Sequence, residues 1–153
     1  MKEIKVGYYE NGNVKYEIPF ENDEQHGIEK WYYENGNIEY EIPFVKGKRH
    51  GVVRWYDENG NLRRETTFEN GEIHGVAKRY YENGNVEYEI PFENDMQHGV
   101  EKWYDENGNL IRETLYENDV VKEYDENDNL IKETLYENGK LKTGGKNEQN
   151  RMD

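Results

Sequence analysis

Four histidines have the most recognisable coordination chemistry in this sequence, and each is followed by a glycine. They stand 24 residues apart, at His26, His50, His74 and His98. If each interval forms one β-hairpin, as the turn residues below predict, neighbouring histidines lie about 9–10 Å apart. Zinc requires its ligand nitrogens at about 2 Å. We therefore expect no shared metal site and interpret each histidine as a structural polar residue beside a bend.

Carboxylates are the most abundant groups that could act in acid–base catalysis, with 34 aspartates and glutamates in the chain. Catalysis requires a singular set of groups in a pocket that perturbs their pKa values. Here each glutamate has near-equivalents in other repeats, and no Ser/His/Asp set stands out. No glycine motif follows a strand and opens a helix, as phosphate-binding motifs do, and turn chemistry explains the Asp/Asn-rich segments better than calcium binding does. We expect a non-enzymatic protein with no catalytic residue, no metal and no cofactor.

Aromatic side chains are the residues most suited to binding, because tyrosine and tryptophan are enriched in the hot spots of protein interfaces. The chain has 14 tyrosines and 3 tryptophans, placed at recurring positions. One interpretation is that their rings form the core. The sequence encodes no helix to cover them, so a bend in the sheet, self-association or a partner must shield the rings. The predicted partner-binding residues are Trp31, Tyr33, Tyr40, Trp55, Tyr81, Tyr88 and Trp103.

Composition narrows the class of protein. The 153 residues include a single alanine, Ala77, which argues against a helical fold, and no cysteine, which excludes disulfides. The formal net charge of −14 disfavours nucleic acid and anionic membranes as partners, because both are polyanions, and it favours a basic protein partner. The N-terminal residues lack the apolar run of a signal peptide, so a cytoplasmic location is expected.

The histidines, carboxylates and aromatic residues are positioned by strands, whose ends two sets of turn residues indicate. Asn-Gly is the strongest short-range signal for a β-hairpin with a type I′ turn, and it occurs at 11–12, 35–36, 59–60, 83–84 and 107–108. A sixth, shortened repeat has Asn127-Asp128 at this position. A second set of turns is predicted at Asn22-Asp23, Lys46-Gly47, Asn70-Gly71, Asn94-Asp95, Asn118-Asp119 and Asn138-Gly139.

Two turns per repeat predict two strands per repeat. We therefore predict an all-β fold, an elongated single-layer antiparallel β-meander of tandem 24-residue hairpin repeats, bent at the His-Gly step. Residues 1–142 are expected to form a single repeat domain of about six β-hairpins. Residues 143–153 lack the pattern and are predicted to be a disordered C-terminal tail.

The two turn sets predict one pairing register, because both place the same residues of the strand at 72–82 on one face. The predicted pairs are Tyr81–Val86, Arg79–Tyr88, Ala77–Ile90, Ile73–Phe68 and Ala77–Arg64. In the second repeat, the face with the rings carries Trp31, Tyr33, Ile38, Tyr40, Ile42 and Phe44. The opposite face is predicted to carry the charge pairs Lys30–Glu41, Arg54–Glu65, Lys78–Glu89 and Lys102–Glu113.

Variation between the repeats suggests a further set of contacts. Tyr33 and Tyr81 occupy a position where other repeats have aspartate. In the repeats with aspartate, the residue diagonally across the hairpin is basic instead of tyrosine. We interpret this exchange as the replacement of an aromatic pair by an acid–base pair. The predicted pairs are Asp57–Arg64, Asp105–Arg112 and Asp125–Lys132.

The His-Gly step is where the strands are expected to bend. The register places its glycines opposite aromatic rings, and a ring laid across a glycine can replace the missing side chain. Proline precedes that ring in three repeats and cannot donate to the ladder, so pairing must break there. We predict a crease that gives the sheet the section of a trough, fading in the sixth repeat, which lacks the step and should act as a cap. The facing residues are Phe44, Phe68, Phe92 and Tyr116, and the prolines are Pro19, Pro43 and Pro91.

Over residues 8–142 the chain resembles the bacterial MORN-variant repeat, a membrane-occupation-and-recognition-nexus-like hairpin. The residues that carry the resemblance are Gly-x-x-x-x-Trp-Tyr-x-Glu-Asn-Gly-Asn-Leu-x-x-Glu-x-x-Phe-x-Asn-Gly-x-x-His-Gly. The resemblance implies an elongated antiparallel sheet used for binding or assembly, and an antitoxin- or immunity-like role such as stand-alone bacterial arrays have. Related eukaryotic repeats are linked to phosphoinositide membranes, a role that the acidic charge opposes.

These observations lead to one functional prediction and two alternatives. We predict a protein-binding module whose acidic, aromatic trough covers the basic surface of a toxin-like partner, since opposite charge speeds encounter. One alternative is a repeat protein that binds glycan or choline-like groups in its aromatic groove. The other is a purely structural scaffold, or a homo-oligomer built through the open edges of the sheet.

Overall fold

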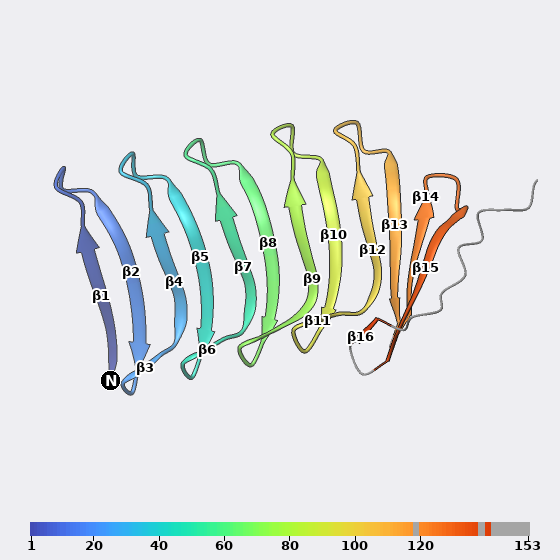
Figure 1. Ribbon diagram of the computed structural model, residues 1–153. Helices are drawn as coiled ribbons and strands as arrows, with labels where there is room; N and C mark the ends of the chain where they lie inside the picture. The colour runs from blue at the N-terminus through green and yellow to red at the C-terminus, as the bar shows by residue number, and fades with distance from the viewer. Residues whose placement is uncertain (118–119, 138–139, 142–153) are drawn as a thin grey trace, which may run out of the picture.

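The computed structural model describes residues 1–117, 120–137 and 140–141, and these residues form a single-layer antiparallel sheet (Figure 1). The described residues contain no helix, and hence none long and apolar enough to cross a membrane. The predicted all-β meander is therefore confirmed. The proposed tail, 143–153, lies outside the described residues.

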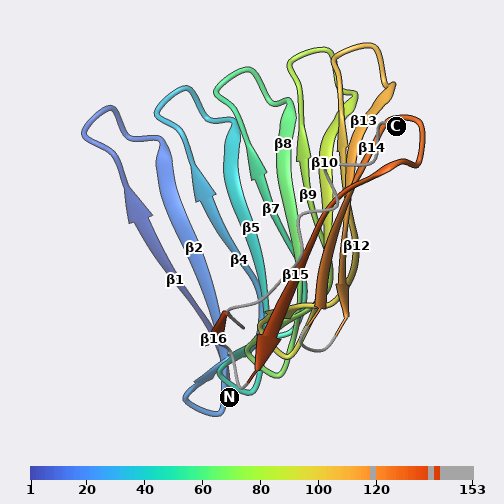
Figure 2. The same cartoon turned by 45° about the vertical axis from the view of Figure 1, so that its right-hand side comes forward.

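Long strands pair in chain order as six hairpins, and adjacent hairpins pair in turn (Figure 1). They are β1 (Lys2–Tyr8), β2 (Val14–Glu21), β4 (Gly27–Tyr32), β5 (Ile38–Val45), β7 (Gly51–Tyr56), β8 (Leu62–Glu69), β9 (Glu72–Tyr80), β10 (Val86–Glu93), β12 (Gly99–Tyr104), β13 (Leu110–Glu117), β14 (Val120–Asp125) and β15 (Leu130–Glu137). Four strands of two residues are β3 (Glu24–Gln25), β6 (Lys48–Arg49), β11 (Met96–Gln97) and β16 (Lys140–Leu141). Figure 2 shows that the strands follow one another in one twisted layer.

The Asn-Gly turns are not of type I′, which corrects the prediction for them. In the loop after β4 only Gly36 has a positive φ, of 91°, and its N–H donates to Tyr33 O at 2.9 Å. The Tyr33 N–H donates to Asn37 O at 2.9 Å, which makes a three-residue loop closed by a glycine bulge. The Asn35 side-chain oxygen accepts a hydrogen bond from the Asn37 N–H at 2.9 Å. This side-chain bond favours a turn in which asparagine keeps a negative φ.

A second bulge follows each of these loops and changes the register next to it. Val86 pairs with Tyr80, so the predicted Tyr81–Val86 pair is wrong, as is the grouping of Ile38 with Tyr33, because Ile38 pairs with Tyr32. Glu87 of β10 is the extra, unpaired residue of the bulge, and it accounts for the one-residue shift in register between Val86 and Tyr88. Beyond the bulge the predicted pairs Arg79–Tyr88 and Ala77–Ile90 are confirmed.

The second set of turns is of type I′ where it is described. Both central residues have a positive φ in Asn22-Asp23, Lys46-Gly47, Asn70-Gly71 and Asn94-Asp95. The predicted turns at 118–119 and 138–139 lie outside the described residues. One dipeptide, Asn-Gly, thus forms two turn types in this chain, depending on the loop that surrounds it.

The ladder breaks at proline, as predicted. Pro19 has no N–H, and its carbonyl accepts from the His26 N–H at 3.1 Å, so β3 and β4 are separate strands. In the third repeat Thr67 replaces proline, and β9 runs unbroken through His74-Gly75. Between the pairs Phe68–Ile73 and Thr66–Ala77, β9 has two more residues than β8, and this shifts the register. The predicted Ala77–Arg64 pair is therefore wrong, whereas Ile73–Phe68 is confirmed.

Three glycines of the bend, Gly27, Gly51 and Gly99, pack against proline rather than against a ring, and Gly75 packs against Thr67. Gly27 pairs with Phe44 as predicted, and its φ is 111°. A Cβ added at Gly27 would nevertheless lie 3.2 Å from Pro19 Cγ, and one added at Gly51 would lie 3.1 Å from Pro43 Cγ. The predicted covering ring is thus replaced by the proline of the preceding strand. In the sixth repeat β13 and β14 pair without a register shift, which confirms that the break is absent there.

Replacing Gly51 by alanine is expected to lower the free energy of unfolding by about 1–3 kcal/mol, because a side chain at this positive φ is strained and meets Pro43. Equilibrium unfolding in urea measures the loss. Gly60 is the matched control, since its φ is 86° but nothing lies within 4 Å of an added Cβ. G60A should cost less, and P43A should recover part of the loss caused by G51A. Equal losses for G51A and G60A would contradict a packing role for the proline.

Candidate functional site

One face of the sheet carries a continuous line of aromatic and arginine side chains, each directly opposite the next across neighbouring strands. We call this line the aromatic row. Its members are Tyr16, Trp31, Tyr40, Trp55, Arg64, Arg79, Tyr88, Trp103 and Arg112. Such cross-strand neighbours are the contacts that stabilise a sheet, so the row is held in position by the same pairing that forms the fold.

The aromatic row contains two tyrosine–tryptophan pairs of similar geometry. The ring centroids of Tyr16 and Trp31 are 5.1 Å apart at an interplanar angle of 44°. Those of Tyr88 and Trp103 are 4.9 Å apart at 49°. Both separations lie in the range of favourable aromatic contacts.

Arginines interrupt the row and stack on two of the tryptophans. The Arg64 guanidinium lies 5.5 Å from the Trp55 ring centroid, and the Arg112 guanidinium lies 5.1 Å from that of Trp103. Arg79 is directly opposite Arg64, and Glu87 compensates its charge at 3.0 Å. The row is therefore divided into two aromatic clusters with basic residues between them.

The structure brings five of the seven predicted site residues into the row. Trp31, Tyr40, Trp55, Tyr88 and Trp103 share one face, as expected. Tyr33 and Tyr81 instead lie in the loops, where their hydroxyls donate to main-chain oxygens of the following repeat, Tyr56 O and Tyr104 O, both at 2.8 Å. The role of the seven in binding stays a prediction.

Sequence reasoning missed the other members of the row. Tyr16 stands 24 residues before Tyr40, and Arg64 and Arg112 stand at equivalent positions in later repeats. Arg79 stands 24 residues after Trp55, so the repeat spacing was a sufficient signal for all four. A two-residue turn places Arg64 and Arg112 diagonally opposite Asp57 and Asp105, which is why the sequence predicts them as partners of these aspartates.

Two glutamates of this face bind the indole N–H groups of tryptophans in the row. Glu29 Oε1 accepts from Trp31 Nε1, and its Oε2 accepts from Gln25 Nε2 at 2.6 Å. Glu101 accepts from Trp103 Nε1 and Gln97 Nε2 in the same manner. The shared motif is Gln-His-Gly-Ile/Val-Glu-Lys-Trp-Tyr at 25–32 and 97–104. Each carboxylate therefore fixes the orientation of a tryptophan ring.

Charges of alternating sign line the opposite face. We call this line the charge row, and its members are Glu17, Lys30, Glu41, Arg54, Glu65, Lys78, Glu89, Lys102 and Glu113. The predicted pairs Arg54–Glu65, Lys78–Glu89 and Lys102–Glu113 form ion pairs at 3.1, 2.8 and 3.4 Å. Lys30 is directly opposite Glu41, as predicted. Charge on this face is thus largely neutralised within the sheet.

Tyrosines beside the charge row have raised pKa values. Burial and a hydrogen bond to Glu65, at 2.6 Å, raise the pKa of Tyr80 from 10.0 to about 12. Burial and a hydrogen bond to Glu17 raise the pKa of Tyr32 to about 12 in the same way. The neutral hydroxyl donates to the carboxylate, so loss of its proton is disfavoured.

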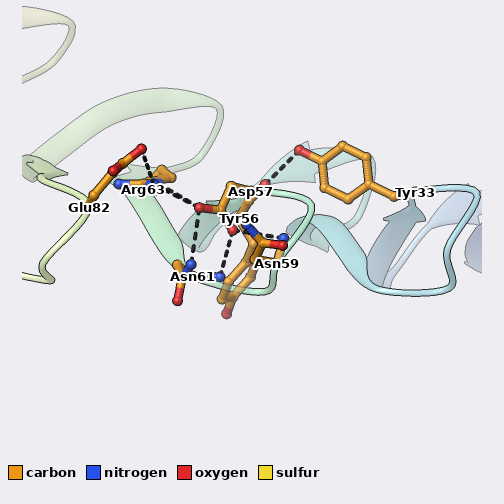
Figure 3. Close-up of polar contacts among 7 residues, drawn as sticks. All are labelled: Tyr33, Tyr56, Asp57, Asn59, Asn61, Arg63 and Glu82. Carbon is orange, nitrogen blue, oxygen red and sulfur yellow. Dashed lines mark hydrogen bonds and ion pairs between the residues drawn. The ribbon is translucent and has the colours of Figure 1, made fainter.

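The loops at the Asn-Gly end are of two kinds, and Figure 3 shows where they meet. Loops that begin with tyrosine bind the next repeat: besides the Tyr33 hydroxyl, the side-chain amides of Asn35 and Asn37 donate to Glu58 O, both at 2.8 Å. Loops that begin with aspartate close on themselves. Asp57 accepts from the N–H groups of Asn59 and Asn61 at 3.0 and 2.9 Å, and the Asn61 bond is the first cause of the lowered pKa of Asp57.

The predicted acid–base pairs of these loops are wrong. The basic partner of Asp57 is Arg63, at 2.8 Å, which also reaches Glu82 of the next repeat at 3.6 Å (Figure 3). Arg63 is the extra residue of the bulge, which moves Arg64 one position away. The other predicted pairs are likewise replaced: Arg112 binds Glu101 and Lys132 binds Glu123.

The histidines connect repeats. His26 Nδ1 accepts from the Lys46 N–H, and His50 Nδ1 accepts from the Asn70 N–H, both at 3.4 Å, each in the turn of the following repeat. Across the described part of the chain, no group of three His, Asp or Glu side chains is placed to hold a metal ion. These contacts support the structural interpretation of the histidines.

Comparison with known families identifies the repeats. Six consecutive segments match the family model described as MORN repeat variant, at 5–22, 25–46, 49–70, 73–94, 97–118 and 120–138. No curated protein matches the chain. Among solved structures, the one titled "Crystal Structure of TarM" aligns with a TM-score of 0.40 and 15% identity, over 76% of this chain and 20% of that one. The chain thus spans about a fifth of that protein, and so distant a likeness carries no argument.

The raised pKa values of the tyrosines beside the charge row predict a loss of stability at alkaline pH. Because the folded-state pKa of Tyr80 lies above its unfolded value, its contribution is complete below about pH 10 and is lost as the pH rises through about 12. Unfolding in urea at several pH values should show a smaller decline for Y80F than for the parent chain. E65Q should lower the pKa of Tyr80, measured by ultraviolet titration. An unchanged decline in Y80F would refute this assignment.

Proposed function

The chain belongs to the MORN repeat variant family, and from this premise we propose that it is a non-enzymatic module that binds a basic protein segment along its aromatic row. The family supplies the repeat architecture. The proposal about the partner comes from the chemistry of the two faces.

The observation that carries the proposal is that the aromatic row remains accessible. No hydrophobic side chain among the described residues is fully buried, and Tyr40 is 36% exposed. The rings are nevertheless held in place by cross-strand neighbours and by the Glu29 and Glu101 carboxylates. Binding to rings that are already ordered costs little conformational entropy, which is the property of an interface hot spot.

Electrostatics favours a basic partner. The chain has a net charge of −14, and such a field raises the rate of association with a positively charged protein. The charge row pairs most of its own charges, whereas on the aromatic face the carboxylates of Glu29 and Glu101 lie beside the rings of Trp31 and Trp103. The basic segment is therefore expected on the aromatic face.

The mode of action that follows is occlusion. A rigid sheet laid over a basic surface blocks that surface from its other ligands, without any chemical step. This is the mode expected of an antitoxin- or immunity-like protein with a toxin-like partner, and we include that role and a cytoplasmic location in the proposal.

Substitution of Trp31 by alanine tests the proposal. A purified basic partner captured by the chain should bind W31A about tenfold or more weakly, as loss of a hot-spot aromatic does, and its affinity should fall as salt rises. Ile28 is the matched control because it lies on the opposite face and is 50% exposed, so I28A should bind as the parent does. Calorimetry gives each dissociation constant.

Two results would overturn this function. The first is that every captured basic protein binds W31A and the parent chain equally well. The second is a saturable change in tryptophan fluorescence with choline or an oligosaccharide in the absence of any protein partner, which would establish the small-ligand alternative.

A further inference from the structure

The two motifs in which a glutamate binds a tryptophan of the aromatic row, Glu29–Trp31 and Glu101–Trp103, differ in whether an arginine lies beside the tryptophan. In the fifth repeat the Arg112 guanidinium lies over the Trp103 ring and bonds to Glu101 Oε1 at 3.4 Å. In the second repeat the residue directly opposite Trp31 is Tyr40 instead of arginine. The same carboxylate and indole are therefore present in the second repeat without the cation.

The tyrosine that packs on the tryptophan and the hydrogen bonds of the glutamate match between the two sites. Each tryptophan packs on a tyrosine of the preceding strand, Tyr16 for Trp31 and Tyr88 for Trp103, with ring centroids 5.1 and 4.9 Å apart. In each, the carboxylate accepts from the indole and from a glutamine amide. On the strand across the hairpin the two sites differ, because Arg112, Thr114 and Tyr116 of the fifth repeat correspond to Tyr40, Ile42 and Phe44 of the second. Of these differences, only that between Arg112 and Tyr40 changes the charge beside the tryptophan.

Glu29 has an unmatched negative charge. Glu101 is 5% exposed and has Arg112 as its ion-pair partner. Glu29 is half-buried, and no ion pair to it exists among the described residues. A half-buried carboxylate next to an aromatic face favours a cation that can stack and accept desolvation.

We propose that Tyr16, Glu29, Trp31 and Tyr40 form a binding site for an arginine side chain of the partner, which makes the contacts with the indole and the carboxylate that Arg112 makes in the fifth repeat. This inference rests on the proposed function, because it names the group that the basic partner inserts. Arginine is favoured over lysine because its planar, weakly hydrated guanidinium stacks on rings and bonds to a carboxylate at the same time. Among the described residues, the two cations that lie over tryptophans are both arginines, Arg64 and Arg112.

The test uses the full chain and two blocked tripeptides, acetyl-Gly-Arg-Gly-amide and acetyl-Gly-Lys-Gly-amide. Nuclear magnetic resonance resolves the indole N–H signals of the 3 tryptophans, and a phenylalanine substitution at each tryptophan assigns them. The Trp31 signal should shift saturably with the arginine peptide, with a dissociation constant at least about threefold below that of the lysine peptide. The Trp103 signal should not respond, because Arg112 occupies its site.

Two exchanges between the repeats make the test specific. Y40R copies the arrangement of the fifth repeat into the second and should abolish the response of Trp31, whereas Y40Q, which adds no cation, should retain it. R112Y opens the fifth site, so the Trp103 signal should begin to respond. If R112Y proves unfolded by its amide spectrum, the comparison of Y40R with Y40Q decides alone.

The outcomes separate this inference from the proposed function. Equal affinity for the two peptides, no shift of Trp31, or an undiminished response in Y40R would refute the arginine site. A basic partner that still depends on Trp31 would then leave the proposed function intact. Absence of any Trp31-dependent basic partner would refute the proposed function even if the arginine peptide binds.

Discussion

Every feature of this protein depends on the lateral contact between side chains of the same row. The sheet has one layer, so a side chain cannot be covered from above and is shielded only by its neighbours on adjacent strands. Accordingly no hydrophobic side chain among the described residues is buried, and the aromatic side chains remain partly exposed. It also makes the pairing register decisive, because a slip of one residue would exchange the two faces.

Contacts at both ends of the hairpins stabilise that register. At one end, bulges next to the Asn-Gly loops and bonds from tyrosine and asparagine to the following loop connect neighbouring repeats. At the other, histidine accepts a bond from the next turn, and proline packs on the glycine of the bend. Where aspartate replaces tyrosine, as at Asp57, the loop bonds to itself and Arg63 supplies the contact to the next repeat. The repeats are therefore alike in fold but unequal in how strongly each binds the next.

The two faces differ in how far contacts within the chain satisfy their side chains. Alternating charges and hydrogen-bonded tyrosines satisfy one face from within the chain. The aromatic row of the other face is satisfied only in places, by Arg64 and Arg112 on two of its tryptophans. Repetition with small local differences thus produces two versions of one motif, with arginine opposite the tryptophan in the fifth repeat and tyrosine in the second, and the proposed arginine site rests on this difference.

The 24-residue period, the turn residues and the alternation of side chains determined the number of hairpins, the antiparallel order, the break at proline and the pairs Arg54–Glu65 and Tyr88–Arg79. Periodicity suffices for these because each is a contact between adjacent strands at a fixed distance from a turn. The bulges, the partner of Asp57 and the packing of proline on the bend glycine were decided only in the tertiary structure. One extra residue in a strand changes which side chains meet without changing composition or period, and the choice between a two-residue and a three-residue turn depends on bonds that Asn35 and its neighbours make in space. The unequal occupancy of Trp31 and Trp103 is of the same kind, since it arises from the residue that lies across the hairpin and not from the motif itself.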